Sequence, residues 1–568
     1  MKKLMQWAIA AALICSSTVF TGCSKSDDNQ EPVVKPEQPD DNGANSSSDD
    51  IGYIECSWNG TEVVKTSKVT TARDMSTLSY SSGSVRNTIK ISGFYFISGS
   101  FTTDNYLYVD GWAAIILCDG ADLKVSGIYV NNGGTLIIYA QEKGTGHLYA
   151  ETKYSDDFCP AIGTYVGDGG KVEIHGGNVD AKGGIRSAGI GGGGSDDEHA
   201  NLSDIIIYGG RVYGHSNGGA GIGAGAYDTS VKTNITIYDG LIEGSGGTDV
   251  YKGKFYGVGI GGGHRASFGS VNIYGGTVTA SASDESAGIG AGEEAPNGEG
   301  VVNIYGGTVT AQGGARGAGI GGGDGRRLNE INIHGGEVYA YAGADGAGIG
   351  GGEDGDSGDI NIYGGIVRAY GDRWADGSSN KGYGAGIGSG QNGNVNTIII
   401  KGGDVQAYGG MDAAGIGTGE EYGSDINSGT IEIHGGKVWA EGKGYGAGIG
   451  CGEDATFGVL GISGGRVDAH AGSDCGPWSG SIGAYHKDHG ADDNCHIGWA
   501  GWERIYIGAG MRLWTYSPNV GSIETVTNNL PWWNYVHQRP QAAFDVCDHP
   551  GYTEATCPFC YRETLQLR

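Results

Sequence analysis

The sequence predicts an all-β fold, a right-handed parallel β-helix (solenoid) of about ten regular coils between an N-terminal and a C-terminal cap. Three observations support this prediction. A motif with two adjacent glycines returns about every thirty residues, a second glycine motif lies between its copies, and glycine accounts for 115 of 568 residues. Such a composition is typical of repeat proteins with many tight turns.

The first motif alternates apolar and variable residues, in the form Ile-x-Ile-[Tyr/His]-Gly-Gly followed by Val-x-Ala. Alternation with period two places the apolar side chains on one face of a β-strand. The glycine pairs begin at Gly176, Gly209, Gly275, Gly306, Gly335, Gly364, Gly402, Gly435 and Gly464, and an altered copy lies at Asp239 and Gly240.

The second motif, Ala-Gly-Ile-Gly, lies between copies of the first, for example at residues 318–321 and 347–350. The predicted strands are too short to enclose a core alone, and no helical pattern separates them. Stacking coil upon coil is the remaining arrangement, with equivalent residues about 4.8 Å apart. Regular coils are therefore expected over residues 160–484.

Two flanking regions depart from the repeat. Residues 51–159 carry a degenerate version, which we interpret as an N-terminal cap and the first coils. Residues 485–568 gain five tryptophans and a Cys/His cluster, which indicates a C-terminal cap. Caps are expected because open sheet ends pair with other chains.

The first residues have the layout of a secretory signal, two lysines, an apolar stretch and then Phe20-Thr21-Gly22-Cys23. This ending resembles a bacterial lipobox, which implies a signal peptide over residues 1–22 and lipidation of Cys23, with palmitate. Residues 23–50 are rich in Pro, Asp, Asn and Ser, as expected for a disordered tether. Residues 24–28 resemble an acidic export tag, which implies the outer face of the outer membrane.

The formal net charge is −29, from 65 acidic and 36 basic residues. The resulting field repels phosphate backbones, so nucleic acid is not expected as a partner. No segment after the signal approaches the roughly twenty apolar residues of a membrane-spanning helix.

The run at residues 114–150, together with the two repeated motifs, resembles a family of bacterial surface proteins with pectate-lyase-like parallel β-helices, whose members are mostly uncharacterised. The resemblance covers roughly residues 90–490. It implies the fold and a position at the cell surface. It does not imply an activity, because a fold alone does not define a function.

The residue after each Ile-x-Ile strand forms a column that we expect to face outward. Stacked aromatic rings with flat apolar faces and hydroxyl groups suit sugar rings, although such rings can equally stabilise the ladder of coils. The predicted ligand-binding residues are Tyr208, Tyr238, Tyr274, Tyr305, His334, Tyr363 and His434, with Trp374 from the longest coil. His175, Lys401 and Ser463 occupy the same column, and Asn272, Asn303, Asn332 and Asn361 form a structural ladder beside it.

Acidic residues after the second motif form another column. Like charges in register destabilise a sheet, so these side chains either extend into water or bind a cation, for which calcium is the candidate. The predicted calcium ligands are Glu293, Glu353, Asp354, Glu420 and Glu453. The column is interrupted by His264-Arg265 and by Gln391-Asn392.

Catalysis requires different groups to converge on one bond, which a uniform column does not supply. The enzymatic form of the pectate-lyase-like fold pairs acidic calcium ligands with a basic residue. The resemblance therefore implies the catalytic candidates His264, Arg265, Glu293, Glu294, Asp324 and Arg326.

The C-terminal region contains Cys547, His549, Cys557 and Cys560 in the spacing of a tetrahedral zinc site. A disulfide is the alternative in an oxidising exterior, and Cys475 with Cys495 could form another. A structural zinc ion would stabilise the cap.

Three functions follow from these patterns. The leading hypothesis is a non-catalytic cell-surface protein that binds extracellular glycan along its coils. The alternatives are a carbohydrate-active enzyme, either a polysaccharide lyase or a glycoside hydrolase, and a purely structural stalk.

Overall fold

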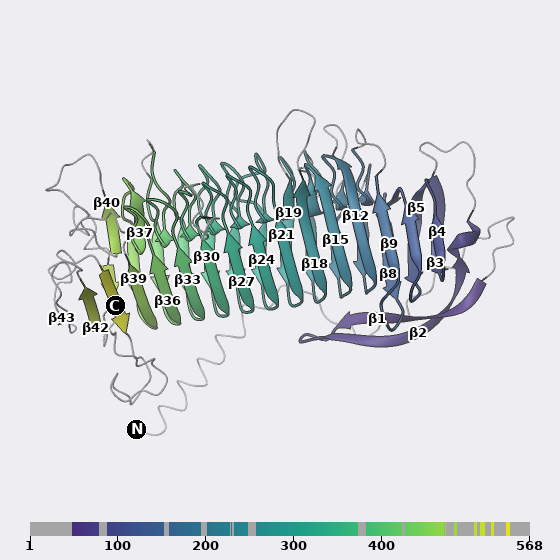
Figure 1. The fold of residues 1–568 in the computed structure, drawn as a ribbon, viewed down its shortest axis with the longest axis horizontal. Helices are drawn as coiled ribbons and strands as arrows, with labels where there is room; N and C mark the ends of the chain where they lie inside the picture. The colour runs from purple at the N-terminus through teal and green to yellow at the C-terminus, as the bar shows by residue number, and fades with distance from the viewer. Residues whose placement is uncertain are drawn as a thin grey trace, which may run out of the picture. The chain divides into compact units, whose positions relative to one another are not determined.

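The computed structural model describes residues 48–78, 88–152, 158–167, 169–194, 202–227, 229, 232–247, 257–372, 382–422, 426–470, 472 and 482–485, and four strands between residues 505 and 545. Most of these residues form a parallel β-helix in which each regular coil contributes one strand to each of three stacks (Figure 1). No helix among them is long and apolar enough to cross a membrane.

The first stack contains the Ile-x-Ile strands. Its members are β8 (Thr135–Ala140), β11 (Lys171–Ile174), β14 (Asp204–Ile207), β17 (Thr233–Ile237), β20 (Phe268–Ile273), β23 (Val301–Ile304), β26 (Glu330–Ile333), β29 (Asp359–Ile362), β32 (Thr397–Ile400), β35 (Thr430–Ile433) and β38 (Val459–Ile462), followed by β41 (Ile505–Ile507).

The second stack contains the Val-x-Ala strands, which come directly after the glycine pairs. Its members are β9 (His147–Glu151), β12 (Asn178–Ile185), β15 (Arg211–Asn217), β18 (Leu241–Gly247), β21 (Thr277–Ser281), β24 (Thr308–Gln312), β27 (Glu337–Tyr341), β30 (Ile366–Tyr370), β33 (Asp404–Tyr408), β36 (Lys437–Glu441) and β39 (Arg466–His470).

The third stack contains the short Ile-Gly strands of the second motif. Its members are β7 (Gly127–Tyr129), β10 (Ile162–Thr164), β13 (Ile190–Gly192), β16 (Ala220–Gly223), β19 (Val258–Gly261), β22 (Ile289–Gly290), β25 (Ile320–Gly321), β28 (Ile349–Gly350), β31 (Ile387–Gly388), β34 (Ile416–Gly417), β37 (Ile449–Glu453) and β40 (Ile482–Tyr485).

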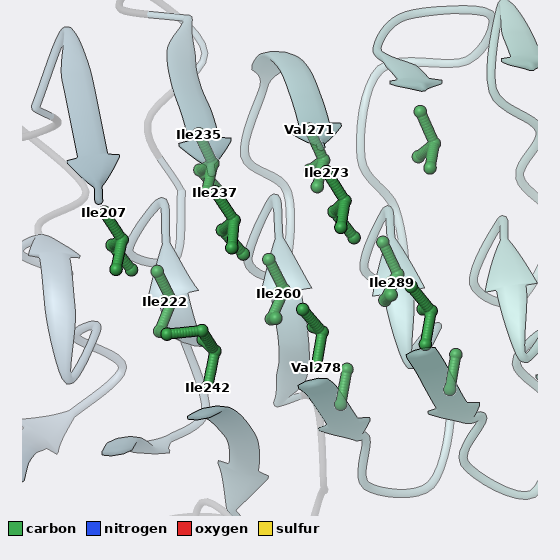
Figure 2. Close-up of a cluster of buried hydrophobic side chains, with 14 of the residues drawn as sticks. Ile207, Ile222, Ile235, Ile237, Ile242, Ile260, Val271, Ile273, Val278 and Ile289 are labelled. Carbon is green, nitrogen blue, oxygen red and sulfur yellow. The ribbon is translucent and has the colours of Figure 1, made fainter. Parts of the chain in front are cut away.

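Identical residues lie above one another inside the coils. Strands β23, β26 and β29 pair in parallel so that Ile304, Ile333 and Ile362 are in register. These side chains are fully buried. Figure 2 shows the same arrangement in earlier coils, where isoleucines and valines from all three stacks point toward one another. The core is therefore a continuous column of apolar side chains, which neighbouring coils complete for each other.

The glycine of the third stack is required by both its backbone angle and its neighbour. Gly321 has a φ of +144°, and a Cβ placed on it would lie 1.8 Å from the carbonyl oxygen of Gly350 in the next coil. Only glycine permits this approach between successive backbones.

The N-terminal region contains irregular coils and a long hairpin. Strands β3 (Thr88–Ile97), β5 (Tyr106–Leu117), β4 (Ser100–Thr102) and β6 (Asp122–Val125) extend the stacks, and the short 3₁₀ helix η1 (Met75–Thr77) precedes them. Strands β1 (Ser48–Trp58) and β2 (Val63–Asp74) pair antiparallel over all of β1 and all but the last residue of β2. Figure 1 shows this hairpin lying along the coils rather than across their open end.

At the other end, strands β44 (Gln541–Asp545), β42 (Arg512–Tyr516) and β43 (Glu524–Val526) continue the second stack in antiparallel pairing. The predicted all-β parallel β-helix is confirmed. Strand β1 begins at Ser48, inside the segment predicted as a tether.

Candidate functional site

The aromatic residues after the first-stack strands form one continuous ring column. It runs through Tyr139, His175, Tyr208, Tyr238, Tyr274, Tyr305, His334 and Tyr363, with 4.6–5.1 Å between successive ring centroids. Tyr139 was missed in the sequence, although its run Ile137-Ile138-Tyr139 carries the same pattern.

The rings use their faces to stack on one another. In the section Tyr274–Tyr305–His334–Tyr363 the centroids are 4.6 Å apart and the planes differ by only 5–8°. The expectation of flat faces open to a ligand is therefore wrong for these rings. The column instead presents ring edges, phenol hydroxyls and an imidazole edge, because each inner face is covered by the next ring.

The hairpin covers the beginning of the column. The Cys56 backbone N–H donates to His175 Nδ1 at 2.9 Å, and the Cys56 thiol donates to the His175 carbonyl oxygen. Trp58, at the end of β1, lies 4.9 Å from Tyr238 and 5.3 Å from Tyr274, measured between centroids. The element that covers the beginning of the column is therefore this N-terminal hairpin.

Exposure of the rings changes where the hairpin ends. Tyr139 and His175 are buried, and Tyr208, Tyr238 and Tyr274 are half-buried. Beyond Trp58, Tyr305 and Tyr363 are 40% and 38% exposed. Burial raises the pKa of Tyr208 to about 12 and raises that of Tyr274, because the phenolate loses contact with water.

A cation and an amide ladder border the exposed section. Lys401 places its ammonium group 4.5 Å from the centroid of Tyr363. Asn361 donates to Asn332, which donates to Asn303, at 3.1 and 3.0 Å, so the predicted asparagine ladder exists as a chain of side-chain hydrogen bonds. His434 lies further along and contacts Ser463 and Glu432. Trp374 lies outside the described residues.

A second aromatic ladder, which is not among the predicted sites, lies on the second stack. Tyr341, Tyr370 and Tyr408 stack at 5.0 and 5.1 Å with planes 5–6° apart. The signal was available, because each tyrosine follows the alanine of Val-x-Ala.

Acids of the column join acids that precede the second motif in two compact groups of carboxylates. In the first, Glu285, Glu293 and Asp324 bring one oxygen each within 4.8 Å of one another. Arg316 pairs with Glu285, Asp324 and Glu353 at 3.8, 3.2 and 3.0 Å. The arginine thus supplies positive charge at this group.

Burial controls the protonation of these acids. It raises the pKa of Glu285 to about 7, with a further contribution from the neighbouring carboxyl group of Glu293. Burial also raises the pKa of Glu353 to about 7, although Arg316 opposes the shift. The pKa of Asp324 is raised for the same reason. At neutral pH the carboxyl groups of Glu285 and Glu353 are therefore only partly ionised.

The second group contains Asp412, Glu420 and Glu453. Asp412 accepts a hydrogen bond from the backbone N–H of Tyr445, and Glu420 accepts one from Gln391. Carboxylate oxygens are the donors that calcium prefers, so this donor set fits the predicted ion. Of the predicted ligands, Glu420 and Glu453 meet here, Glu293 belongs to the first group, and Glu353 pairs with Arg316 beside it.

Several acids of the column have a backbone role. Glu294, Asp354 and Asp454 have φ values of 51°, 54° and 62° at equivalent turns, where Asn392 and Arg265 interrupt the column with similar angles. Asp and Asn adopt this left-handed conformation more readily than most residues. Asp354 is thus primarily a turn residue.

The catalytic candidates converge only in part. His264 Nδ1 lies 3.2 Å from Glu293 Oε2, but these side chains are only 5% and 11% exposed. Arg265 forms an exposed ion pair with Glu294. Glu285, Arg316 and Asp412 were missed, although all three come two positions before the Ala-Gly-Ile-Gly motif.

Other predicted sites lie outside the described residues. These are the lipidation residue Cys23, the zinc ligands Cys547, His549, Cys557 and Cys560, and the pair Cys475 and Cys495. Cys56, Cys118, Cys159 and Cys451, within the described part, are buried.

The geometry defines a parallel β-helix repeat protein with an external ring column. A family model described as beta helix repeat matches residues 172–194, 271–293, 302–324, 331–353, 360–391, 398–420 and 431–453, which supports a parallel β-helix repeat family. No curated protein and no solved structure matches the chain.

Proposed function

We propose that this protein is a cell-surface lipoprotein that binds a neutral extracellular glycan along the exposed section of the ring column, Tyr305, His334 and Tyr363. The observation that carries the proposal is the uncovered, regular run of these rings, which lie 4.6 Å apart beyond the tip of the hairpin. A linear polymer lying along the coils would meet equivalent groups at each step.

The chemistry of the column suits sugars through edges rather than faces. Apolar ring edges can contact the C–H groups of a pyranose, and the tyrosine hydroxyls can donate to and accept from its hydroxyl groups. Lys401 adds a donor at one end. Because the formal net charge is −29, an acidic polysaccharide would be repelled.

The test is binding of the chain from Ser24 onward to a polysaccharide array, with and without calcium. We expect the substitutions Tyr305→Ala and Tyr363→Ala together to weaken binding by about tenfold or more, the loss of about 1.4 kcal/mol. Tyr422→Ala is the matched control, because this tyrosine is 82% exposed and outside the column. Equal binding by wild type and the double variant would contradict the proposal.

A second candidate function is acid–base catalysis on glycans at the Glu285 group. A carboxyl group with a pKa of about 7 is suited to donate a proton at neutral pH. New reducing or unsaturated ends in the same array wells, lost in Glu285→Gln, would favour the enzyme. If neither glycan binding nor product formation is detected, the purely structural stalk is the remaining function.

We also propose that Cys23 anchors the chain to the outer membrane, facing the exterior. The support is the lipobox-like sequence and the acidic residues after it. Metabolic labelling with a palmitate analogue should tag wild type and leave Cys23→Ser untagged. A calcium ion at the acidic column and a zinc ion at the C-terminal cysteines stay predictions, which metal analysis of the purified chain tests.

A further inference from the structure

Trp58 occupies a position on the covered part of the ring column, which we call the ring seat. Its indole is stacked on Tyr238 at 4.9 Å with planes 22° apart, and lies 5.3 Å from Tyr274 at 47°. Because the Tyr238 and Tyr274 centroids are themselves 5.1 Å apart, the three rings form a nearly equilateral triangle. A flat ring from another element thus contacts two successive column rings at once.

The column is splayed at the ring seat. Tyr208–Tyr238 and Tyr238–Tyr274 are both spaced 5.1 Å, with planes 18° and 26° apart. In the exposed section the spacing is 4.6 Å and the planes differ by 5–6°. The wider spacing and the larger tilt occur in the part of the column that Trp58 contacts.

The hairpin that carries Trp58 has few ladder contacts with the coils. Within the described residues, β1 pairs with β8 only at Ile54 and Ala140, and β2 pairs with β3 only through Arg73 and Asp74. Arg73 and Asp74 lie at the end of the hairpin away from the tip, and Ile54 lies four residues before Trp58. Close to the tip the hairpin is held by the hydrogen bonds between Cys56 and His175 and by the Trp58 stack.

We propose that the ring seat is a binding site for a flat-faced pyranose ring, filled within the same chain by Trp58. A glycan extending from Tyr305 along the column would displace the hairpin tip and add Tyr274 and Tyr238 to its site. The identity of the ligand rests on the proposed glycan-binding function. The claim that the ring seat can exchange Trp58 for another ring does not rest on that function.

Tyrosine nitration of the full chain, mapped by mass spectrometry, tests whether Trp58 shields the seat. In Trp58→Ala we expect Tyr238 and Tyr274 to react about 2- to 10-fold faster, the factor that corresponds to one lost aromatic pair. Tyr363 should react at the same rate in both proteins. Trp58→Phe keeps a flat ring and should keep most of the protection. Unchanged rates in Trp58→Ala, or equal loss in both variants, would overturn the proposal.

Occupation from outside is tested on Trp58→Ala with two added probes, N-acetyltryptophanamide and cellohexaose, whose glucose chairs present apolar C–H faces. We expect both to restore protection of Tyr238 and Tyr274. Protection by the indole compound alone would overturn the assignment to sugars, and protection by neither would overturn an exchangeable seat. Equal array binding by wild type and the variant with Tyr305→Ala and Tyr363→Ala would instead contradict the proposed function. The two experiments are distinguishable, because the array tests Tyr305 and Tyr363 whereas the nitration probes test Tyr238 and Tyr274.

Discussion

At the scale of single residues, positions inside the coils tolerate little change, because each residue contacts its own copy in the next coil. Gly321 shows the constraint from the backbone, and Ile333 shows it from the core, where it is fully buried between Ile304 and Ile362. The acids of the Glu285 group are different, because their surroundings do not stabilise them in the form that they take in water. Burial disfavours the charge that these carboxyl groups carry in water.

Gly321→Ala should destabilise the protein strongly, because the new Cβ would lie 1.8 Å from a backbone oxygen at a φ of +144°. We expect a loss of more than about 2 kcal/mol in the free energy of unfolding, measured by denaturant titration. Gly325→Ala is the control, since Gly325 has a φ of +65° but nothing within 4 Å of its Cβ position. Gly325→Ala should lower the free energy of unfolding by only about 1–2 kcal/mol. Equal losses for the two variants would contradict the close approach of the coils at Gly321.

The raised pKa values of Glu285 and Glu353 predict a dependence of stability on pH. Each pKa is about 7 in the folded protein against 4.5 ordinarily, so the folded state binds more protons between these values. The free energy of unfolding should therefore fall as pH rises from about 4.5 to about 7, with no further loss from these groups above that range. Glu285→Gln with Glu353→Gln should flatten this slope in denaturant titrations, and an unchanged slope would contradict the assignment.

At the scale of elements, the sequence predicted the strands and both columns well, because their signals repeat along the chain. It did not predict the hairpin on the ring column. Cys56 and His175 are 119 residues apart, and the hairpin occurs once, so no periodicity indicates where it lies. The sequence also missed Arg316, whose role depends on acids from neighbouring coils.

Arg316→Gln should destabilise the coils around the Glu285 group more at pH 8 than at pH 5. At high pH the carboxylates that Arg316 contacts are charged, and at low pH protonation removes the repulsion. Because Arg316 is 48% exposed, we expect only about 1 kcal/mol at pH 8. Thermal unfolding of Lys90→Gln provides the control, since its pair with Asp110 is 73% and 63% exposed and should matter little at either pH.

At the scale of the whole molecule, the described coils form a scaffold that repeats the same external groups at nearly constant spacing. This regularity favours recognition of a periodic polymer over chemistry at a single bond, because a column supplies many equivalent contacts and little asymmetry. The hairpin divides the ring column into a covered part and an exposed part, and so sets which rings a ligand meets first.

Protection of Tyr305 and Tyr363 from nitration by a polysaccharide bound on the array is the measurement that tests glycan binding most directly. The proposed function predicts that the bound glycan slows the reaction of these two tyrosines and leaves Tyr422, which is 82% exposed, unchanged. Equal reaction rates at Tyr305 and Tyr363 with and without saturating glycan would show that the exposed section of the ring column is not the binding site.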